Sequence, residues 1–135
     1  MITPGMERWL NKYRRVIDAG ELTRVLRFLS NESGDPGLQD VEKRSLALLL
    51  GKVLDGNFIL FKNTNPDNVG FEVSFFLQLK GWPRSIIGTR HPADEVKGWT
   101  RTQIETDLLN EYNRTIDWGQ NVLREVIKKA DYVEI

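Results

Sequence analysis

The sequence contains no cysteine and a single histidine, His91. The absence of cysteine excludes disulfide bonds, thiolate metal ligands and a cysteine nucleophile. With one histidine, a zinc site built from several imidazoles is also excluded, and no nucleophile elbow of the Gly-x-Ser-x-Gly type is present. These absences exclude several of the common catalytic arrangements of side chains, and they favour a non-catalytic protein over an enzyme.

The chain also lacks a long apolar run and an excess of charge. No stretch approaches the roughly 20 apolar residues of a membrane helix, and residues 1–9 carry no signal-peptide pattern. Its 19 basic and 19 acidic side chains balance, whereas nucleic-acid binders usually carry a basic excess. We therefore expect a soluble, cytoplasmic protein with no membrane contact, and the charge balance disfavours nucleic acid as its partner. The length of 135 residues predicts a single domain over 1–135.

The N-terminal part of the sequence is predicted to be helical. Apolar residues at helical spacing predict helices over about residues 4–18 and 21–31, separated by Gly20. A third helix, over about residues 38–54, is apolar nearly all round at its centre, which is typical of a helix buried on most sides. We predict that this third helix is the central element of the core.

The middle of the sequence has the pattern of a sheet. Residues 57–62 form a short apolar run, and residues 71–80 alternate between apolar and polar side chains. The turn-forming residues between them predict an antiparallel hairpin, and residues 84–89 predict a third strand. Phe76 lies on the side of the second strand that should be wet, which suggests that this face is covered as well.

The C-terminal part is again helical in pattern. Residues 91–98 predict one or two helical turns, and a capping-box pattern at Thr100 precedes a helical stripe over about residues 102–131. A straight helix of that length would be on the order of 44 Å, more than the about 37 Å expected for the whole domain. It therefore bends near Trp118-Gly119 or projects. The predicted fold is α+β: N-terminal helices, a central antiparallel two- to three-stranded β-meander, and a long C-terminal helix.

The tryptophans and arginines direct attention to one surface. Trp9 and Trp118 fall near helical stripes and are predicted to be core, whereas Trp82 and Trp99 fall in predicted loops. Aromatic residues and arginines are enriched in protein-binding hot spots, although both loop indoles could instead close the ends of the core. The predicted partner-binding residues are Trp82, Arg84, Arg90, His91, Asp94, Glu95, Trp99, Glu105 and Asp107. The hairpin tip, residues 65–68, is a second candidate.

By elimination we expect a non-catalytic protein-binding module, without a cofactor or metal. The specific hypothesis is an inhibitor of the immunity-protein type that blocks the active site of a toxin, such as a nuclease. It rests on what small domains of this kind commonly do, and on no motif. Such an inhibitor should present an acidic face to a basic active site. That face would comprise Asp94, Glu95, Glu105, Asp107 and Glu111.

Two other classes of function stay open. One is a carboxylate-dependent hydrolase that holds Mg²⁺ through residues such as Asp94 and Glu95. The other is a nucleic-acid-binding regulator that uses Arg8, Lys12 and Arg15, which are spaced to line one face of the first helix. A homodimer through the C-terminal helix is compatible with all three classes.

Overall fold

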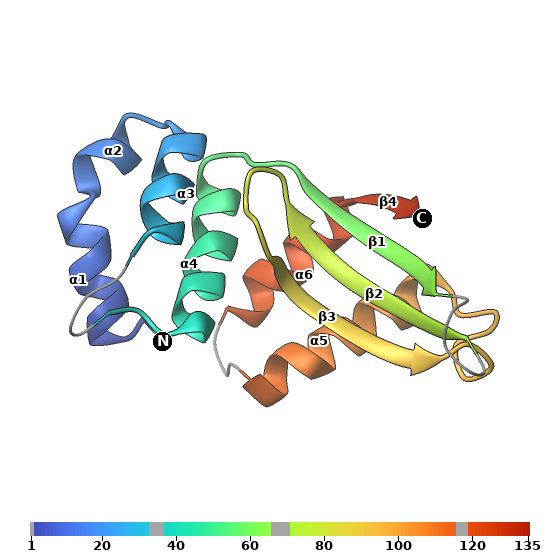
Figure 1. Cartoon of the computed structure of the whole chain (residues 1–135). Coiled ribbons are helices and arrows are strands. Elements are labelled where there is room, and N and C mark those ends of the chain that lie inside the picture. The colour runs from blue at the N-terminus through green and yellow to red at the C-terminus, as the bar shows by residue number, and fades with distance from the viewer. Residues whose placement is uncertain (1, 33–36, 66–70, 116–118) are drawn as a thin grey trace.

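A computed structural model describes residues 2–32, 37–65, 71–115 and 119–135, without the side chains of 113–115. Over these residues the chain forms six helices and a four-stranded sheet, and the fold is of the mixed α+β kind (Figure 1). The elements are α1 (Pro4–Lys12), α2 (Arg14–Asp18), α3 (Leu22–Ser30), α4 (Asp40–Val53), β1 (Phe58–Asn65), β2 (Glu72–Leu79), β3 (Ser85–Pro92), α5 (Arg101–Thr115), α6 (Gln120–Lys129) and β4 (Asp131–Glu134).

The predicted first helix is two helices. Thr3 caps α1 by accepting a hydrogen bond from the backbone N–H of Met6, but Tyr13 leaves the helical conformation with φ −106° and ψ 19° and starts α2. The Tyr13 ring lies 4.8 Å from the ring of Trp9 and 5.0 Å from that of Phe28, centroid to centroid. At the interruption between α1 and α2, the Tyr13 ring thus bridges Trp9 of α1 and Phe28 of α3. One continuous helix had been predicted here, without this aromatic contact.

The predicted third helix is confirmed as a central element of the core. A capping box of Gln39 and Glu42 begins α4, whose middle is fully buried, with Leu46 and Ala47 at 0% exposure. It contacts α1 and α3 on one side and β2, β3 and α6 on the other. At its end Gly51 lets β1 and β2 approach closely, because a Cβ there would lie 2.6 Å from the Phe58 ring. The helix therefore joins the N-terminal helices to the sheet.

The sheet has the strand order β3-β2-β1-β4. The hairpin of β1 and β2 and the third strand are confirmed, with antiparallel pairing throughout. The strand β3 is longer than predicted, because His91 and Pro92 pair with β2. Residues 93–98 then form turns, so the prediction of helical turns over 91–98 is wrong.

The prediction of one long C-terminal helix is also wrong, because this part of the chain forms α5, α6 and β4. Gly119, with φ +77°, is the N-cap of α6, and Ala130 leaves the helix in an extended conformation. The last residues then pair with β1 in parallel, with Tyr132 opposite Leu60. A bend was predicted near Trp118-Gly119. Gly119 lies at the break before α6, and Trp118 lies outside the described residues.

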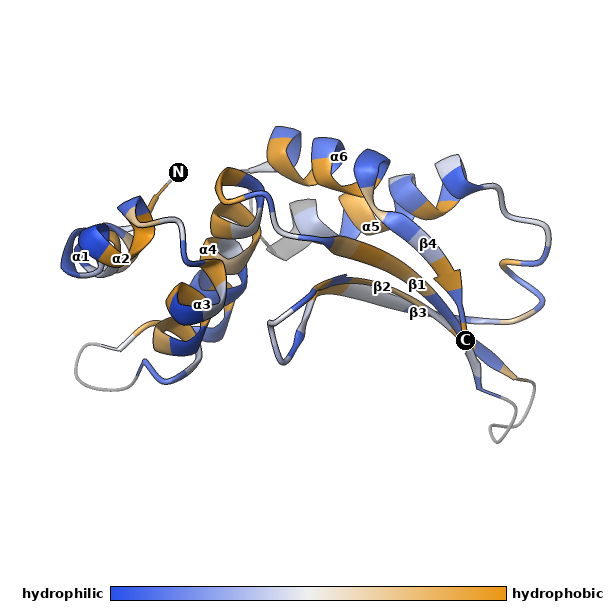
Figure 2. Cartoon of the chain, turned by 90° about the horizontal axis from the view of Figure 1, so that it is seen from above, coloured by the Kyte–Doolittle hydropathy of each residue, from blue (hydrophilic) through white to orange (hydrophobic). Residues whose placement is uncertain are grey.

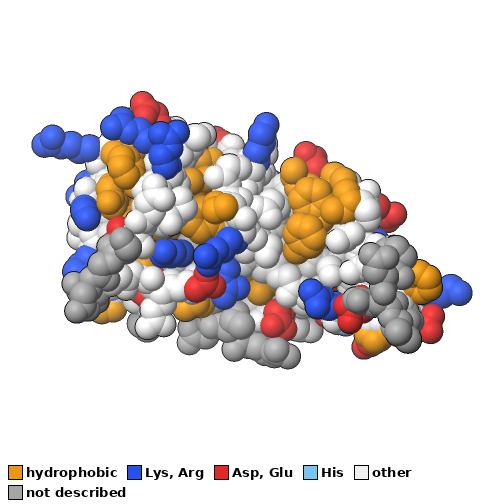
Figure 3. Space-filling view, viewed as in Figure 1, with side chains coloured by type: hydrophobic (Ala, Val, Ile, Leu, Met, Phe, Trp, Pro, Cys, Tyr) orange, Lys and Arg blue, Asp and Glu red, His pale blue; other side chains and the backbone are white. Residues whose placement is uncertain are grey.

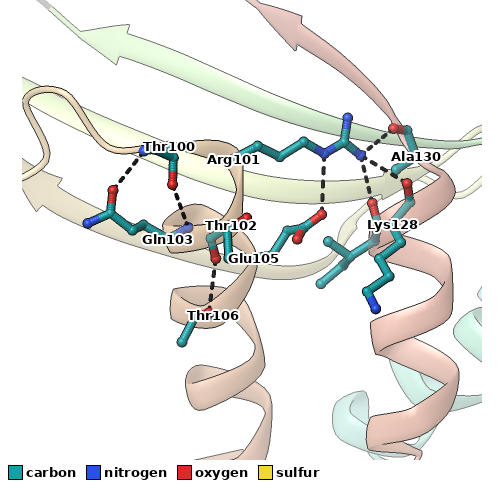
Figure 4. Close-up of polar contacts among 9 residues, drawn as sticks. Thr100, Arg101, Thr102, Gln103, Glu105, Thr106, Lys128 and Ala130 are labelled. Atoms are coloured by element: carbon teal, nitrogen blue, oxygen red, sulfur yellow. Dashed lines mark hydrogen bonds and ion pairs between the residues drawn. The ribbon is translucent and has the colours of Figure 1, made fainter.

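Arg101 fastens the end of α6 to the start of α5 (Figure 4). Its guanidinium donates to the backbone oxygens of Ile127 at 2.8 Å and Ala130 at 2.7 Å. Both oxygens lie at the C-terminus of α6, where the usual helical partners run out, and the Ile127 oxygen also accepts from the N–H of Ala130 at 3.2 Å. Glu105 accepts from the same guanidinium at 3.3 Å. The predicted capping box is confirmed, since the Thr100 hydroxyl and the Gln103 side chain bond each other's backbone N–H.

The two faces of the sheet have different surroundings. The helices α5 and α6 lie over one face, whereas no described element lies over the other (Figure 2). The covered face carries the buried side chains of β2, which are Val73, Phe75, Leu77 and Leu79. The opposite face, which we call the open face, is turned toward the viewer in Figure 1.

Candidate functional site

The open face carries apolar side chains at its centre. Phe61 of β1 and Phe76 of β2 are directly opposite in the register, and their rings stack with centroids 5.0 Å apart and planes at 28°. Val133 of β4 pairs with Phe61 on the other side and is 37% exposed. We call these three residues the apolar strip. Figure 3 shows hydrophobic side chains gathered over the sheet on this face.

The apolar strip ends on β3 at a glycine. Gly88 is the register partner of Phe76, and a Cβ at Gly88 would lie 3.3 Å from the Cβ of Phe76. Beside the two residues the surface is hollowed, with a volume of about 490 Å³. The rim of this hollow includes Asn63, Gln78 and Arg90. Because Gly88 has no side chain, the surface beside the aromatic pair is concave.

Polar contacts hold the rim of the hollow in place. The Gln78 side-chain nitrogen donates to the backbone oxygens of Trp82 at 2.5 Å and Arg84 at 2.9 Å. Arg90 lies 3.6 Å from the carboxylate of Glu72 and is 71% exposed. An apolar centre with a polar rim is the usual composition of a protein–protein interface.

A second polar cluster lies on the covered side of β3. The Thr89 hydroxyl donates to Asp107 of α5 at 2.6 Å, and the same carboxylate oxygen lies 2.7 Å from Nε2 of His91. The Trp99 ring is 5.2 Å from the imidazole, centroid to centroid. His91 is thus engaged by an acidic residue and an aromatic ring, and the Thr89 hydroxyl bonds the carboxylate rather than the imidazole. The cluster fastens α5 to β3.

The structure does not bring the two predicted loop tryptophans together. Trp82 is buried, with 4% exposure, and Trp99 stacks on Phe75 at 5.9 Å between centroids. Trp82 precedes the start of β3 at Ser85, whereas Trp99 contacts His91 near the end of that strand. Roughly 20 Å of strand separates Ser85 from His91. Both indoles thus pack against the core. Arg84 is exposed and pairs with Asp40 at 2.5 Å.

The predicted acidic face is only partly assembled. Glu105 pairs with Arg101, and one carboxylate oxygen of Asp107 binds both Thr89 and His91, so both acids already have contacts within the chain. Asp94 and Glu95 are exposed in the turn that follows β3. The hairpin tip lies outside the described residues except for Asn65 of β1.

The residues of the two rival classes are placed as follows. Among the described residues no group of three histidine, aspartate or glutamate side chains is arranged to hold a metal. Arg8 and Lys12 are exposed on α1, whereas Arg15 lies on α2, beyond the break at Tyr13. The long helix proposed for a homodimer is replaced by α5 and α6, which pack against the sheet.

The sequence interpretation missed most of the apolar strip. Phe76 was noted as an exception on the polar side of its strand, and the register now explains it, since Phe61 lies opposite. The apolar run of β1 was itself a signal, because a strand with apolar side chains on both faces is buried on both or binds something. Val133 lies beyond the predicted helix of residues 102–131, and Gly88 was predicted only as part of the third strand.

The fold and the open face define an α+β protein with a one-sided, four-stranded sheet. No protein-family model, curated protein or solved structure matches the chain. Within the described residues, no helix is both long enough and apolar enough to span a membrane.

Proposed function

We propose that the protein is a non-catalytic protein-binding module and that the open face of its sheet is the contact surface. The observation that carries the proposal is the apolar strip of Phe61, Phe76 and Val133 beside the hollow at Gly88. An antiparallel sheet with one wet face normally places polar side chains outward. Contiguous apolar groups there are characteristic of interaction sites.

The charges of the open face favour a protein over a nucleic acid. By the register, its described charged residues on β2, β3 and β4 include Glu72, Arg90 and Asp131, and Arg90 already pairs with Glu72. A nucleic-acid surface requires several lysine or arginine side chains to neutralise phosphates. A partner with an apolar projection that enters the hollow and covers the aromatic pair fits this composition better.

Within this class we propose an inhibitor of the immunity type, which covers the active site of a toxin enzyme. The support is the exposed pair Asp94-Glu95 in the turn after β3, which offers negative charge near one end of the sheet. Electrostatic complementarity with a basic active site would speed association. If this is correct, the chain abolishes the partner's activity at equimolar concentration, and charge reversal at Asp94 and Glu95 weakens the inhibition most at low salt, where exposed charges are least screened.

The test of the general proposal compares three forms of the protein as bait in a native extract. The wild type is compared with the double variant Phe61→Thr/Phe76→Thr and with Val53→Thr. Threonine keeps the preference for strand conformation. Val53, at the end of α4, is 62% exposed and provides a matched loss of exposed apolar surface away from the open face.

We expect the wild type and Val53→Thr to retain the same partner and the double variant to lose it. Loss of the ring–ring interaction should cost about 0.5–1.5 kcal/mol of folding stability, in addition to the apolar area that the two half-buried rings cover. Circular dichroism therefore checks that the double variant is folded. Equal retention of the partner by all three forms, or retention of none, would show that the open face is not the contact surface.

A further inference from the structure

The free side of β3 forms a groove with α5. In the strand order β3 is an edge, so no described strand pairs with its outer side. The helix α5 packs against this strand, and between them lies a cleft of about 400 Å³. Its walls are residues 88–91 of β3 and three residues of α5, Asp107, Asn110 and Glu111. These three are spaced to share one helix face.

The backbone of β3 offers hydrogen-bonding groups to this groove. The N–H of Ala93 donates to the backbone oxygen of Phe71 at 3.0 Å, so these two residues form a hydrogen-bonded pair of the antiparallel ladder. Such pairs alternate along the ladder with non-bonded pairs. By the register, Gly88 and Arg90 belong to non-bonded pairs, and their N–H and C=O groups point away from β2. An edge of this kind is a template for another strand.

The groove is held in a fixed shape. The Asp107 carboxylate binds Thr89 and His91 of the strand at 2.6 and 2.7 Å. The side chains of His91 and Asp107 are each only about a fifth exposed. The helix therefore stands beside the edge strand before any ligand arrives. A preformed site of this kind reduces the ordering cost of binding.

We propose that this groove binds an extended segment of a partner protein, which pairs with β3 as a fifth strand and directs lysine or arginine side chains toward α5. The inference rests on the proposed protein-binding function and adds a mode of recognition at a second surface. Alternate side chains of an added strand face the same side. Two of the three α5 residues in the groove are carboxylic acids, Asp107 and Glu111, so basic side chains at these alternate positions complement the groove.

The probe is an N-acetylated, C-amidated octapeptide in which threonine and lysine alternate. Hydrogen exchange and amide chemical shifts of the ¹⁵N-labelled protein are followed by NMR as the peptide is added up to millimolar concentration. We expect saturable binding and slower exchange at the N–H groups of Gly88 and Arg90. A peptide with glutamate in place of lysine, and one with N-methylated alternate amides, should bind at least several-fold more weakly.

Two variants of one residue separate the backbone contact from the side chain. Arg90→Pro removes the outward N–H, and proline is tolerated at an edge position whose N–H is not used by the ladder. Arg90→Thr keeps the N–H and loses the same contact with Glu72. We expect Arg90→Pro to weaken binding about fivefold to tenfold relative to Arg90→Thr, the effect of one hydrogen bond. Asn110→Lys, an exposed position, should weaken it through repulsion.

Four outcomes would overturn the proposal. The first is equal binding by Arg90→Pro and Arg90→Thr, and the second is no change at Gly88 and Arg90 with the octapeptide. The third is equal affinity for the lysine and glutamate peptides. The fourth is protection of the two amides that rises with protein concentration in the absence of peptide, because the occupant is then a second copy of the chain. Since Phe61→Thr/Phe76→Thr leaves the groove intact, it should bind the octapeptide normally, which distinguishes failure here from failure of the open-face proposal.

Discussion

Replacement of Gly119 by alanine tests the division of the C-terminal region into α5 and α6. If residues 102–131 formed one continuous helix, alanine would be the better residue and would stabilise the protein by about 1 kcal/mol. In the structure Gly119 has φ +77° and caps α6. An alanine in this left-handed conformation costs about 1–2 kcal/mol. The two accounts therefore predict opposite signs.

A second contribution comes from a neighbour. A Cβ at Gly119 would lie 3.1 Å from the hydroxyl oxygen of Tyr112, which is fully buried and has little room to move. Gly20 and Gly98 have φ of +76° and +77° and nothing within 4 Å of an added Cβ. Their alanine variants measure the backbone cost alone. We expect Gly119→Ala to lose about 1–2 kcal/mol as they do, and about 1 kcal/mol more from the contact.

The assay is urea unfolding followed by tryptophan fluorescence and by circular dichroism, with the slope of the transition checked for constancy. For a chain of this size, a loss of 2–3 kcal/mol lowers the melting temperature by roughly 6–12 °C. A stabilised Gly119→Ala variant would refute the break. A loss equal to that of Gly20→Ala and Gly98→Ala would refute the contact with Tyr112 while the break itself would stand.

Three further changes test the packing around the site. Gly51→Ala gains helix propensity but forces a Cβ to 2.6 Å from the Phe58 ring. Overpacking costs about 1–3 kcal/mol, so a net loss of about 1 kcal/mol is expected in the same unfolding assay. Arg101→Met removes the charged donor at the end of α6 and should cost about 1–2 kcal/mol, with faster amide exchange in β4; unchanged exchange there would contradict this role. Burial raises the pKa of the Tyr112 phenol. Its stabilising contribution is therefore complete below the unfolded pKa of about 10 and falls as pH rises through the folded value. Consequently, Tyr112→Phe should lose less stability than the wild type between pH 9 and 11; parallel profiles would exclude this.

Much of the fold could be predicted because it follows from the local periodicity of apolar residues in the sequence. The helix α4 and the strands β1 to β3 follow from apolar spacing and turn residues within short windows. The strand β4 could not, because Asp131–Glu134 is only four residues long and directly follows a helical stripe. Its strand conformation depends on pairing with β1, where Ile59 is the partner of Asp131. A contact so distant in sequence leaves no local signal.

The candidate site was predictable only in part for the same reason. Phe76 broke the alternation of its strand and indicated that the second face of the sheet was not simply wet. That Phe61 and Val133 join it is a consequence of register, which one sequence without pairing information does not provide. Trp82 and Trp99 attracted attention by composition alone, and each packs against the core from its own end of β3.

The most direct measurement of the central claim, that the open face contacts a protein, is site-specific photo-crosslinking in native cells. A photoreactive phenylalanine analogue is placed at Phe61, and in a second form at Val53, which is 62% exposed at the end of α4. The account predicts one discrete cross-linked partner from position 61 and none from position 53. An absence of cross-links at position 61, or the same products from both positions, would contradict it.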